Sequence, residues 1–288
     1  MPYFGAHMSA AGGPEQALQA AASLGMDACQ LFTKNNKQWN GPPISAESKR
    51  LFHQNVREFK IERTVAHASY LINLATRNQE LWLKSLHALV DELQRANYLQ
   101  LDYLVVHPGT ASDADEDGAL QQVALAVNQA LSTFPKLKTR LLLETTAGQG
   151  KSIGHTFRQL GTILERVKSK RKIGVCLDTC HIFAAGYALY PANDYRSTVD
   201  EFDQEIGLEK LHLLHVNDSV KGLGSRVDRH AALGHGSIGI NGLRNILCDK
   251  RFDALAMILE TPKGKTPRGE DWDAINLQQL RMLSSGRP

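Results

Sequence analysis

The sequence predicts a single α/β domain folded as a (β/α)8 barrel, also called a TIM barrel. Six short apolar runs each end at a histidine, an aspartate or a glutamate, and each interval between these ends has room for one helix. Such runs are typical of parallel strands buried on both faces, and parallel strands require helical crossovers. Polar residues at the carboxyl ends of parallel strands mark the active-site face of this barrel. The six ends are His67, His107, Glu144, Asp178, His215 and Glu260.

The chain contains eight strand-and-helix passes with no linker between them, so we expect one domain over residues 1–288. Apolar segments bounded by Gly, Pro or polar turns are the expected strands. Because side chains alternate between the two faces of a strand, His212 is expected to face the helices when His215 faces the other way. The expected strands cover residues 3–7, 28–32, 64–67, 104–107, 141–144, 174–178, 211–215 and 257–260.

Each intervening helix has its own signal. The first helix is Ala-rich, the second follows the N-cap residue Ser45, and the third carries a leucine stripe on one face. The fourth begins in the acidic segment 113–117, which suits the positive end of a helix dipole. The last four fill the intervals that parallel strands require. The expected helices cover residues 15–23, 45–60, 80–97, 113–133, 155–168, 194–206, 241–247 and 271–283.

Composition sets the broad class of the protein. Hydrophobic residues make up 42% of the 288 positions and charged residues 22%, which is ordinary globular usage and argues against disorder. The net charge of +3 is too small to establish a nucleic-acid partner by itself. The four cysteines form neither a disulfide framework nor a zinc knuckle. No secretory or membrane-spanning segment is recognised, so we expect a soluble cytoplasmic protein.

Three further residues extend the set of potential metal ligands. Asp228 and His230 are two positions apart in an extended loop, so their side chains point the same way, and His181 closely follows Asp178. The resulting nine imidazoles and carboxylates exceed the three or four ligands of one zinc ion. Two or three ions are therefore predicted, and the histidine-rich set favours zinc over magnesium.

Other residues of this region have two possible explanations. A lone histidine at a strand end is more often structural than a ligand, but six coincident ends favour a multi-metal site. His7 could orient a ligand or simply pack. Cys180 could compete for zinc, although a buried thiol is the simpler expectation.

The motifs in this order resemble the endonuclease IV family of zinc-dependent abasic-site DNA endonucleases, which is AP endonuclease family 2. The resemblance covers almost the whole chain, from Gly5 to Glu260. The segments that carry it are GAHMSAAGG, LFTKNNKQW, HASYLINL, HPG, ETTAGQG, CLDTCH, HVND, GSRVDRH, LGHGSIG and LET.

The resemblance implies three zinc ions and a hydrolytic mechanism. The family's pattern places one ion on His67, His107 and Glu144, with Glu144 as the bridging, catalytic carboxylate. A second ion would be held by Glu144, Asp178, His215 and Glu260. A third would be held by His181, Asp228 and His230. The family cleaves the phosphodiester bond 5′ to an abasic site, leaves a 3′-hydroxyl, and trims blocked 3′ ends.

The resemblance also implies a partner, which is duplex DNA with abasic sites or blocked 3′ ends. Tyr70 and Leu71 would wedge into the duplex, where unstacking is cheapest at a site without a base. The implied enzyme is a monomer with no protein partner and no membrane. It is bacterial-type, cytoplasmic and associated with the nucleoid during repair. The other expected DNA contacts are Lys34, Asn35, Asn36, Lys37, Arg226 and Arg229.

The chain departs from the family's usual residues at four places, and none of these departures removes a predicted ligand. Arg is usual at Lys37, Asn is common at Thr145, Lys is usual at Val220, and Glu is frequent at His235. His7 and His235 are the candidates for residues that support a ligand from behind.

Two other function classes remain open at this point. One is a metal-dependent sugar isomerase on the same type of barrel, which needs only one or two metals. That interpretation leaves Asp228 with His230, and the wedge-like Tyr70, without a purpose. The other is a module that binds damaged DNA without cutting it.

Overall fold

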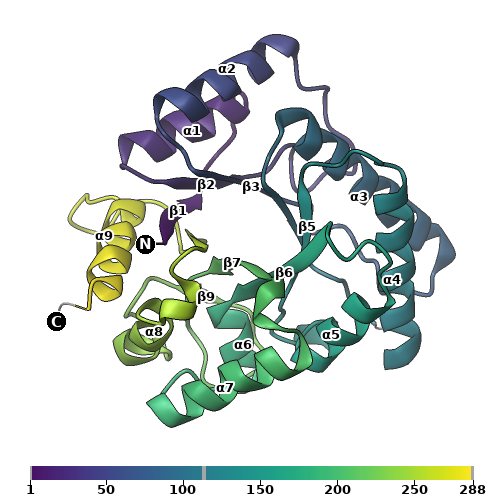
Figure 1. Ribbon diagram of the computed structural model, residues 1–288. Helices are drawn as coiled ribbons and strands as arrows, with labels where there is room; N and C mark the ends of the chain where they lie inside the picture. The colour runs from purple at the N-terminus through teal and green to yellow at the C-terminus, as the bar shows by residue number, and fades with distance from the viewer. Residues whose placement is uncertain (1, 112–114, 287–288) are drawn as a thin grey trace.

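The computed structural model describes residues 2–111 and 115–286, and within them eight parallel strands close into a barrel. Figure 1 shows the strands at the centre with the helices around them. The first and last strands of the barrel, β1 and β10, pair with each other, so segments from both ends of the chain belong to the same barrel. In barrel order the staves are β1 (Tyr3–His7), β2 (Ala28–Leu31), β3 (Arg63–His67), β4 (Tyr103–Val106), β5 (Arg140–Glu144), β6 (Ile173–Asp178), β7 (Leu211–His215) and β10 (Ala256–Leu259).

The expected helices are all present, with ends that shift by a few residues. Part of the acidic segment predicted to open the fourth helix, residues 112–114, lies outside the described residues; that helix begins at Glu116 with Asp115 as its N-cap. The α-helices are α1 (Pro14–Ser23), α2 (Ala46–Glu58), α3 (Gln79–Leu99), α4 (Glu116–Ser132), α5 (Phe157–Arg166), α6 (Thr179–Ala185), α7 (Ala192–Glu205), α8 (Gly239–Leu247) and α9 (Trp272–Ser284).

Two apolar clusters hold the barrel together. A large one fills the space between the strands and the surrounding helices. A smaller one lies inside the barrel, where each member comes from a strand and is almost completely buried. This inner cluster forms an apolar layer beneath the carboxyl ends of the strands, where the polar side chains lie. Its members are Ala28, Val65, Val105, Leu142, Cys176, Leu213, Ala256 and Ile258.

The structure differs from the sequence prediction at several boundaries. Strands β4 and β10 end one residue early, so His107 and Glu260 are the first residues after their strands. Helix α6 was not expected. Its seven residues are almost all buried, so it lacks the polar face by which a surface helix is recognised. The Asp178 carboxylate accepts a hydrogen bond from the backbone N–H of His181 and so caps this helix.

The prediction that His212 faces the helices is wrong. Pairing between β6 and β7 shifts in register at this residue, because Val175 pairs with Leu211 and Cys176 with Leu213. The extra residue in β7 is His212, and such an extra residue changes the direction in which its side chain points. The His212 ring stacks on Tyr103, which packs against the cluster inside the barrel.

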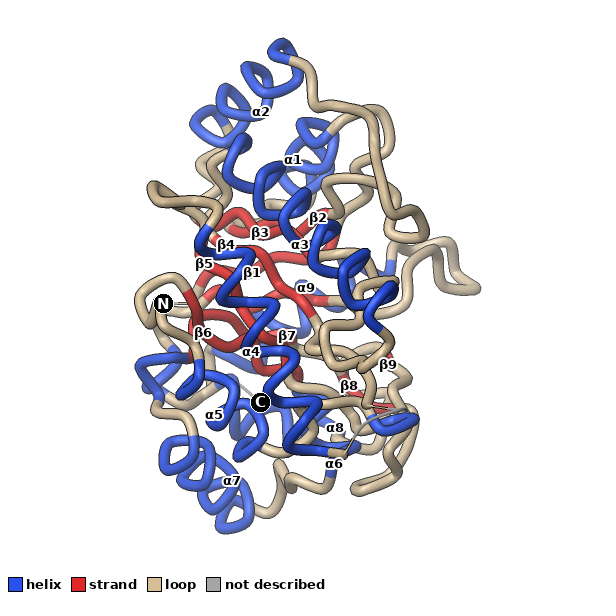
Figure 2. Tube along the Cα trace, turned by 90° about the vertical axis from the view of Figure 1, so that its right-hand side faces the viewer, coloured by secondary structure: helices blue, strands red, loops and turns tan. Residues whose placement is uncertain are grey.

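A long excursion leaves the barrel after β7. It contains the two short antiparallel strands β8 (Asp218–Ser219) and β9 (His230–Ala231). In Figure 2 it lies on the side of the barrel where the long loops project. Asp218 is completely buried, and its carboxylate accepts backbone N–H groups of Gly234, Gly236 and Ile238. This one carboxylate therefore fixes the return of the loop to α8.

Candidate metal centre

The carboxyl ends of the strands bring the predicted ligands together in three adjoining groups. In the first group both histidines approach the same oxygen of Glu144. His67 Nε2 lies 3.1 Å from Glu144 Oε2, and His107 Nε2 lies 2.9 Å from it. Glu144 and His67 are buried, whereas His107 is partly exposed. The three ligand atoms lie close enough together to hold one ion.

The second group surrounds the other oxygen of Glu144. His215 Nδ1 lies 2.8 Å from Glu144 Oε1 and 3.2 Å from Glu260 Oε2. Asp178 Oδ2 is 4.0 Å from the same nitrogen. These four residues form one compact set of possible ligands, and Glu144 is shared with the first group. The arrangement suits a carboxylate that bridges two cations.

The third group joins α6 to the loop after β7. His181 Nε2 lies 3.3 Å from Asp228 Oδ2 and 3.4 Å from His230 Nε2. His230 Nε2 is 3.4 Å from Asp228 Oδ1, so the pair two residues apart in the loop does reach one point. Asp178 and Cys180 also lie close to His230. The Cys180 thiol is buried, as expected, and burial raises its pKa.

Backbone carbonyls fix the orientation of two of these histidines. His67 Nδ1–H donates to the carbonyl of Ala68 at 2.7 Å, and His181 Nδ1–H donates to the carbonyl of Thr145 at 2.7 Å. With the Nδ1 proton held there, the Nε2 lone pair points at a carboxylate or at another imidazole nitrogen. Facing lone pairs repel unless a proton or a cation lies between them, so the donor set fits a metal ion.

The electrostatics of the site agree with this donor set. Burial by itself would raise the pKa of Glu144, but His215 and His107 outweigh it and hold that pKa well below the usual range. Burial would lower the pKa of His181, but Asp178 and Asp228 raise it well above the usual value. The cluster therefore carries buried carboxylates that demand positive charge, which protons or metal ions can supply.

The amide of Gln30, which was not predicted from the sequence, supports the second group. Gln30 Nε2 donates to Glu260 Oε1 at 2.6 Å and to His7 Nδ1 at 3.0 Å. Its Oε1 accepts the Nε2–H of His215 at 2.8 Å, which leaves Nδ1 of His215 free for a ligand role. A signal existed, since an amide interrupts the apolar strand ACQL and is completely buried.

Asn217 was missed for a different reason. Its Nδ2 donates to Asp178 Oδ2 at 2.7 Å and its Oδ1 accepts the backbone N–H of Glu260 at 2.8 Å. It follows β7 in a loop, where a polar residue is unremarkable from sequence alone.

Thr145, one of the departures from the family pattern, contributes two acceptors. Its backbone carbonyl accepts the Nδ1–H of His181, and its hydroxyl accepts the backbone N–H of Asp178.

The two candidate supporting histidines behave differently. His7 Nδ1 lies 3.6 Å from Glu260 Oε1, so its ring lies beside a predicted ligand, and its role in orienting that ligand stays a prediction. His235 is exposed and its ring lies edge-on against Trp272. The structure therefore places His235 against a surface aromatic ring, and the expectation that it supports a ligand is not met.

An open cavity of about 370 Å³ lies over the three groups, and Tyr70 and Arg229 complete its lining. A neighbouring cavity of about 570 Å³ shares Tyr70, His107 and Arg229 with it and extends to Leu71. A larger cavity of about 680 Å³ holds none of the predicted ligands. The site is therefore placed by its chemistry and not by cavity size.

The expected DNA contacts are mostly accessible on this face. Tyr70 is 58% exposed, and its ring lies 5.3 Å from that of His67 and 6.0 Å from that of His107. Asn35, Lys37, Arg226 and Arg229 are exposed, whereas Asn36 and Leu71 are half-buried.

Lys34 is the exception among these residues. Its side chain has no exposed area, and its ammonium lies 2.6 Å from Asp91 and 3.4 Å from Glu92. The structure therefore does not support direct contact between Lys34 and DNA.

Known proteins match this chain over nearly its full length. A sequence model of the family described as "Xylose isomerase-like TIM barrel" matches residues 18–284. A probable endonuclease 4 of Chloroflexus aurantiacus is 44% identical and covers 99% of both chains. One from a Geobacter species is 40% identical over 99% of this chain and 100% of its own. The crystal structure of endonuclease IV from Thermus thermophilus is 37% identical, with a TM-score of 0.85 and coverage of 99% and 100%.

These matches first define a class, the xylose isomerase-like TIM barrels. Within that class the chain belongs to the endonuclease IV family, and it is a nuclease. A D-tagatose 3-epimerase-like protein also superposes, with a TM-score of 0.72 and 18% identity, and at that identity the likeness concerns the fold alone. Within the described residues, no helix combines the length and the apolar character needed to cross a membrane.

Proposed function

We propose that this nuclease cleaves duplex DNA on the 5′ side of abasic sites, leaves a 3′-hydroxyl and trims blocked 3′ ends. One observation carries the proposal. Nine imidazoles and carboxylates from across the chain converge in three adjoining groups beneath an open cavity that exposed Tyr70 overhangs. A metal-dependent sugar isomerase on this barrel would need only one or two metals, which leaves Asp228 with His230 without a purpose.

We propose zinc as the metal, with three ions per chain, because mixed imidazole and carboxylate ligands suit zinc. His67, His107 and Glu144 would hold one ion; Glu144, Asp178, His215 and Glu260 the second; and His181, Asp228 and His230 the third. Zinc held there would make a bound water more acidic and would neutralise charge that develops on the oxygens of a phosphodiester. All these ligands come from one chain, which supports a monomeric enzyme.

The residues of the chain position the substrate and keep the ligands in their reactive form. Tyr70 and Leu71 stand beside the first group and would fill the gap left at a missing base. Exposed Arg226, Arg229 and Lys37 would pair with backbone phosphates. Gln30 and the carbonyls of Ala68 and Thr145 hold imidazole protons away from the metal side.

The test is incision of a duplex that carries one abasic analogue, with a chelator-treated sample and an undamaged duplex as controls. We expect a single cut 5′ to the analogue, a 3′-hydroxyl end, and no activity after chelation until zinc is returned. An intact lesion duplex after incubation with folded, zinc-replete protein would refute the proposal.

A further inference from the structure

Two loops on the proposed DNA face lie side by side above helix α3. We name residues 33–43, which follow β2, the recognition loop, and residues 68–74, which follow β3, the wedge loop. The recognition loop carries Asn35, Asn36 and Lys37, and the wedge loop carries Tyr70 and Leu71. The Ser69 hydroxyl donates to the backbone carbonyl of Asn36 at 2.7 Å, so the two loops touch directly.

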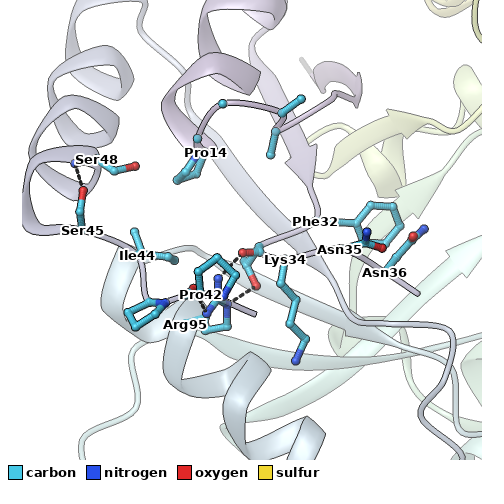
Figure 3. Close-up of a pocket in the computed structure, with 16 residues that line it drawn as sticks. Pro14, Phe32, Lys34, Asn35, Asn36, Pro42, Ile44, Ser45, Ser48 and Arg95 are labelled. Carbon is cyan, nitrogen blue, oxygen red and sulfur yellow. Dashed lines mark hydrogen bonds between the residues drawn. The ribbon is translucent and has the colours of Figure 1, made fainter. Parts of the chain in front are cut away.

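Helix α3 presents two buried charged residues, one turn apart, to the underside of the recognition loop. Arg95 is 8% exposed and donates from Nε to the Thr33 hydroxyl at 3.2 Å and from Nη1 to the Pro42 carbonyl at 2.9 Å. Figure 3 shows Arg95 bonded beside Pro42, while the Lys34 side chain extends away from Asn35 and Asn36. The two ends of the loop are thus bound to one guanidinium.

The second charged residue, Glu92, contacts both loops through a single side chain of α3. It is 1% exposed, and its Oε2 accepts the Thr33 hydroxyl at 2.9 Å. Its Oε1 accepts the backbone N–H of Ser69 at 3.3 Å and lies 3.4 Å from the Lys34 ammonium. One carboxylate therefore binds the recognition loop with one oxygen and reaches the wedge loop with the other.

Burying a carboxylate and an ammonium costs free energy, and an ion pair of this kind is weak evidence for stability. What the arrangement does supply is a fixed geometry, because each oxygen of Glu92 has a partner on a loop that projects from the barrel. We propose that Glu92 is a positioning residue that fixes the recognition loop and the wedge loop relative to each other. The consequence of this positioning for DNA binding rests on the proposed function, whereas the positioning of the two loops by Glu92 does not.

The neighbouring Asp91 provides a matched control. Its Oδ2 lies 2.6 Å from the same Lys34 ammonium, yet its side chain is 37% exposed and its described contact is with the recognition loop alone. Replacing Asp91 by Asn should loosen the recognition loop only. Replacing Glu92 by Gln keeps the shape of the side chain but removes the charge that both loops share.

The experiment is amide hydrogen exchange on the DNA-free protein, comparing the parent with Glu92→Gln and Asp91→Asn. We expect Glu92→Gln to raise exchange on the order of tenfold in both loops, and Asp91→Asn to raise it in the recognition loop alone, with the barrel strands unchanged in both. Exchange in the wedge loop that stays at the parental rate in Glu92→Gln would overturn the proposal. So would equal effects of the two variants on both loops.

A second variant keeps the proposal testable if Glu92→Gln does not fold. Thr33→Val removes the hydroxyl that donates to Glu92 Oε2 and leaves Glu92 itself in place. We expect faster exchange in the recognition loop, and parental exchange there would contradict the proposal.

Binding to a lesion duplex then measures the consequence for DNA. We expect the effects of Lys37→Ala and Tyr70→Ala on the dissociation constant to be coupled in the parent and additive in the Glu92→Gln background. Coupling that survives Glu92→Gln would overturn the positioning role. Failure of the parent to bind or cut the duplex would instead reject the proposed function and leave the exchange result standing.

Discussion

Strand β7 carries two histidines, three residues apart, in opposite environments. His212 lies near the amino end of the strand, where Arg140 Nη1 is 2.7 Å from its Nε2. Burial, Arg140 and Lys210 lower the pKa of His212 to about 4. His215 lies at the carboxyl end; burial would lower its pKa too, but the Cys176 sulfur, Glu260 and Glu144 raise it well above the usual value.

The comparison shows that the imidazole does not by itself make a metal site. His212 is held neutral among cations, so a metal ion there would meet like charge. His215 is surrounded by carboxylates that need a cation. The inner apolar cluster separates the two ends of β7, so the pKa of each histidine is set by that histidine's own neighbours.

Glu144→Gln should have the largest effect, because Glu144 serves two of the three ligand groups. Its loss removes the charge that makes the His215 end differ from the His212 end. We expect incision to fall by more than about 100-fold, since loss of an outer partner alone costs about 10–100-fold in such sites, and bound metal to decrease. Steady-state incision and elemental analysis check this, and parental activity in the variant would contradict the assignment.

Gln30→Leu should have the next largest effect. It removes the acceptor that holds the Nε2 proton of His215 and the donor to Glu260, while leaving every proposed ligand in place. We expect metal affinity to drop by about 10–100-fold with the fold retained. Zinc titration against a competing chelator measures it, with Gln30→Glu as a variant that keeps an acceptor. Unchanged affinity in Gln30→Leu would show that the amide only fills space.

The pH dependence of stability should have opposite signs with and without metal. In the metal-free protein the raised pKa values of His181 and His215 stabilise the fold fully below their unfolded value of about 6.5, and this stabilisation is lost as the pH rises through the folded values. With zinc, deprotonation of the ligands strengthens binding, so stability should rise with pH.

Thermal melts of both forms between about pH 6 and about pH 9 test this sign change. The lowered pKa of Glu144 is not involved, because its contribution is lost only on acidification well below this window. A metal-free protein whose melting temperature rises with pH across the window would contradict the assignment of charge in the cluster.

His212→Gln should have the smallest effect and sharpens the comparison from the other side. We expect unchanged metal content and incision. The lowered pKa of His212 means that the folded state binds fewer protons than the unfolded state, so the parent loses stability as the pH falls below about 6.5. The variant should therefore lose less stability than the parent when the pH falls from about 6.5 to about 5, as measured in thermal melts. Loss of metal would show that the two ends of β7 are coupled.

The strands were predictable because each one is a short apolar run that ends at a proposed metal ligand or at a turn. What the sequence could not show was the register shift that turns His212 toward Tyr103, since strand parity assumes an unbroken ladder. Helix α6 was hidden because its seven residues are almost wholly buried. The local sequence pattern therefore predicts the strands, but it does not predict the register shift in β7 or the buried helix α6.

The proposed ligands could be found from sequence because they recur at equivalent ends of a repeated unit. The residues that orient them could not, because Gln30 and Asn217 act through contacts between strands far apart in the chain. The buried state of Lys34 was likewise invisible, since its partners lie on α3 and a lysine in a polar loop is normally exposed.

The most direct test of the central claim is the metal stoichiometry of the purified protein, measured by elemental analysis after dialysis against metal-free buffer. The account predicts about three zinc ions per chain, one for each of the three ligand groups. A chain that binds a single ion, or none, while folded would contradict it.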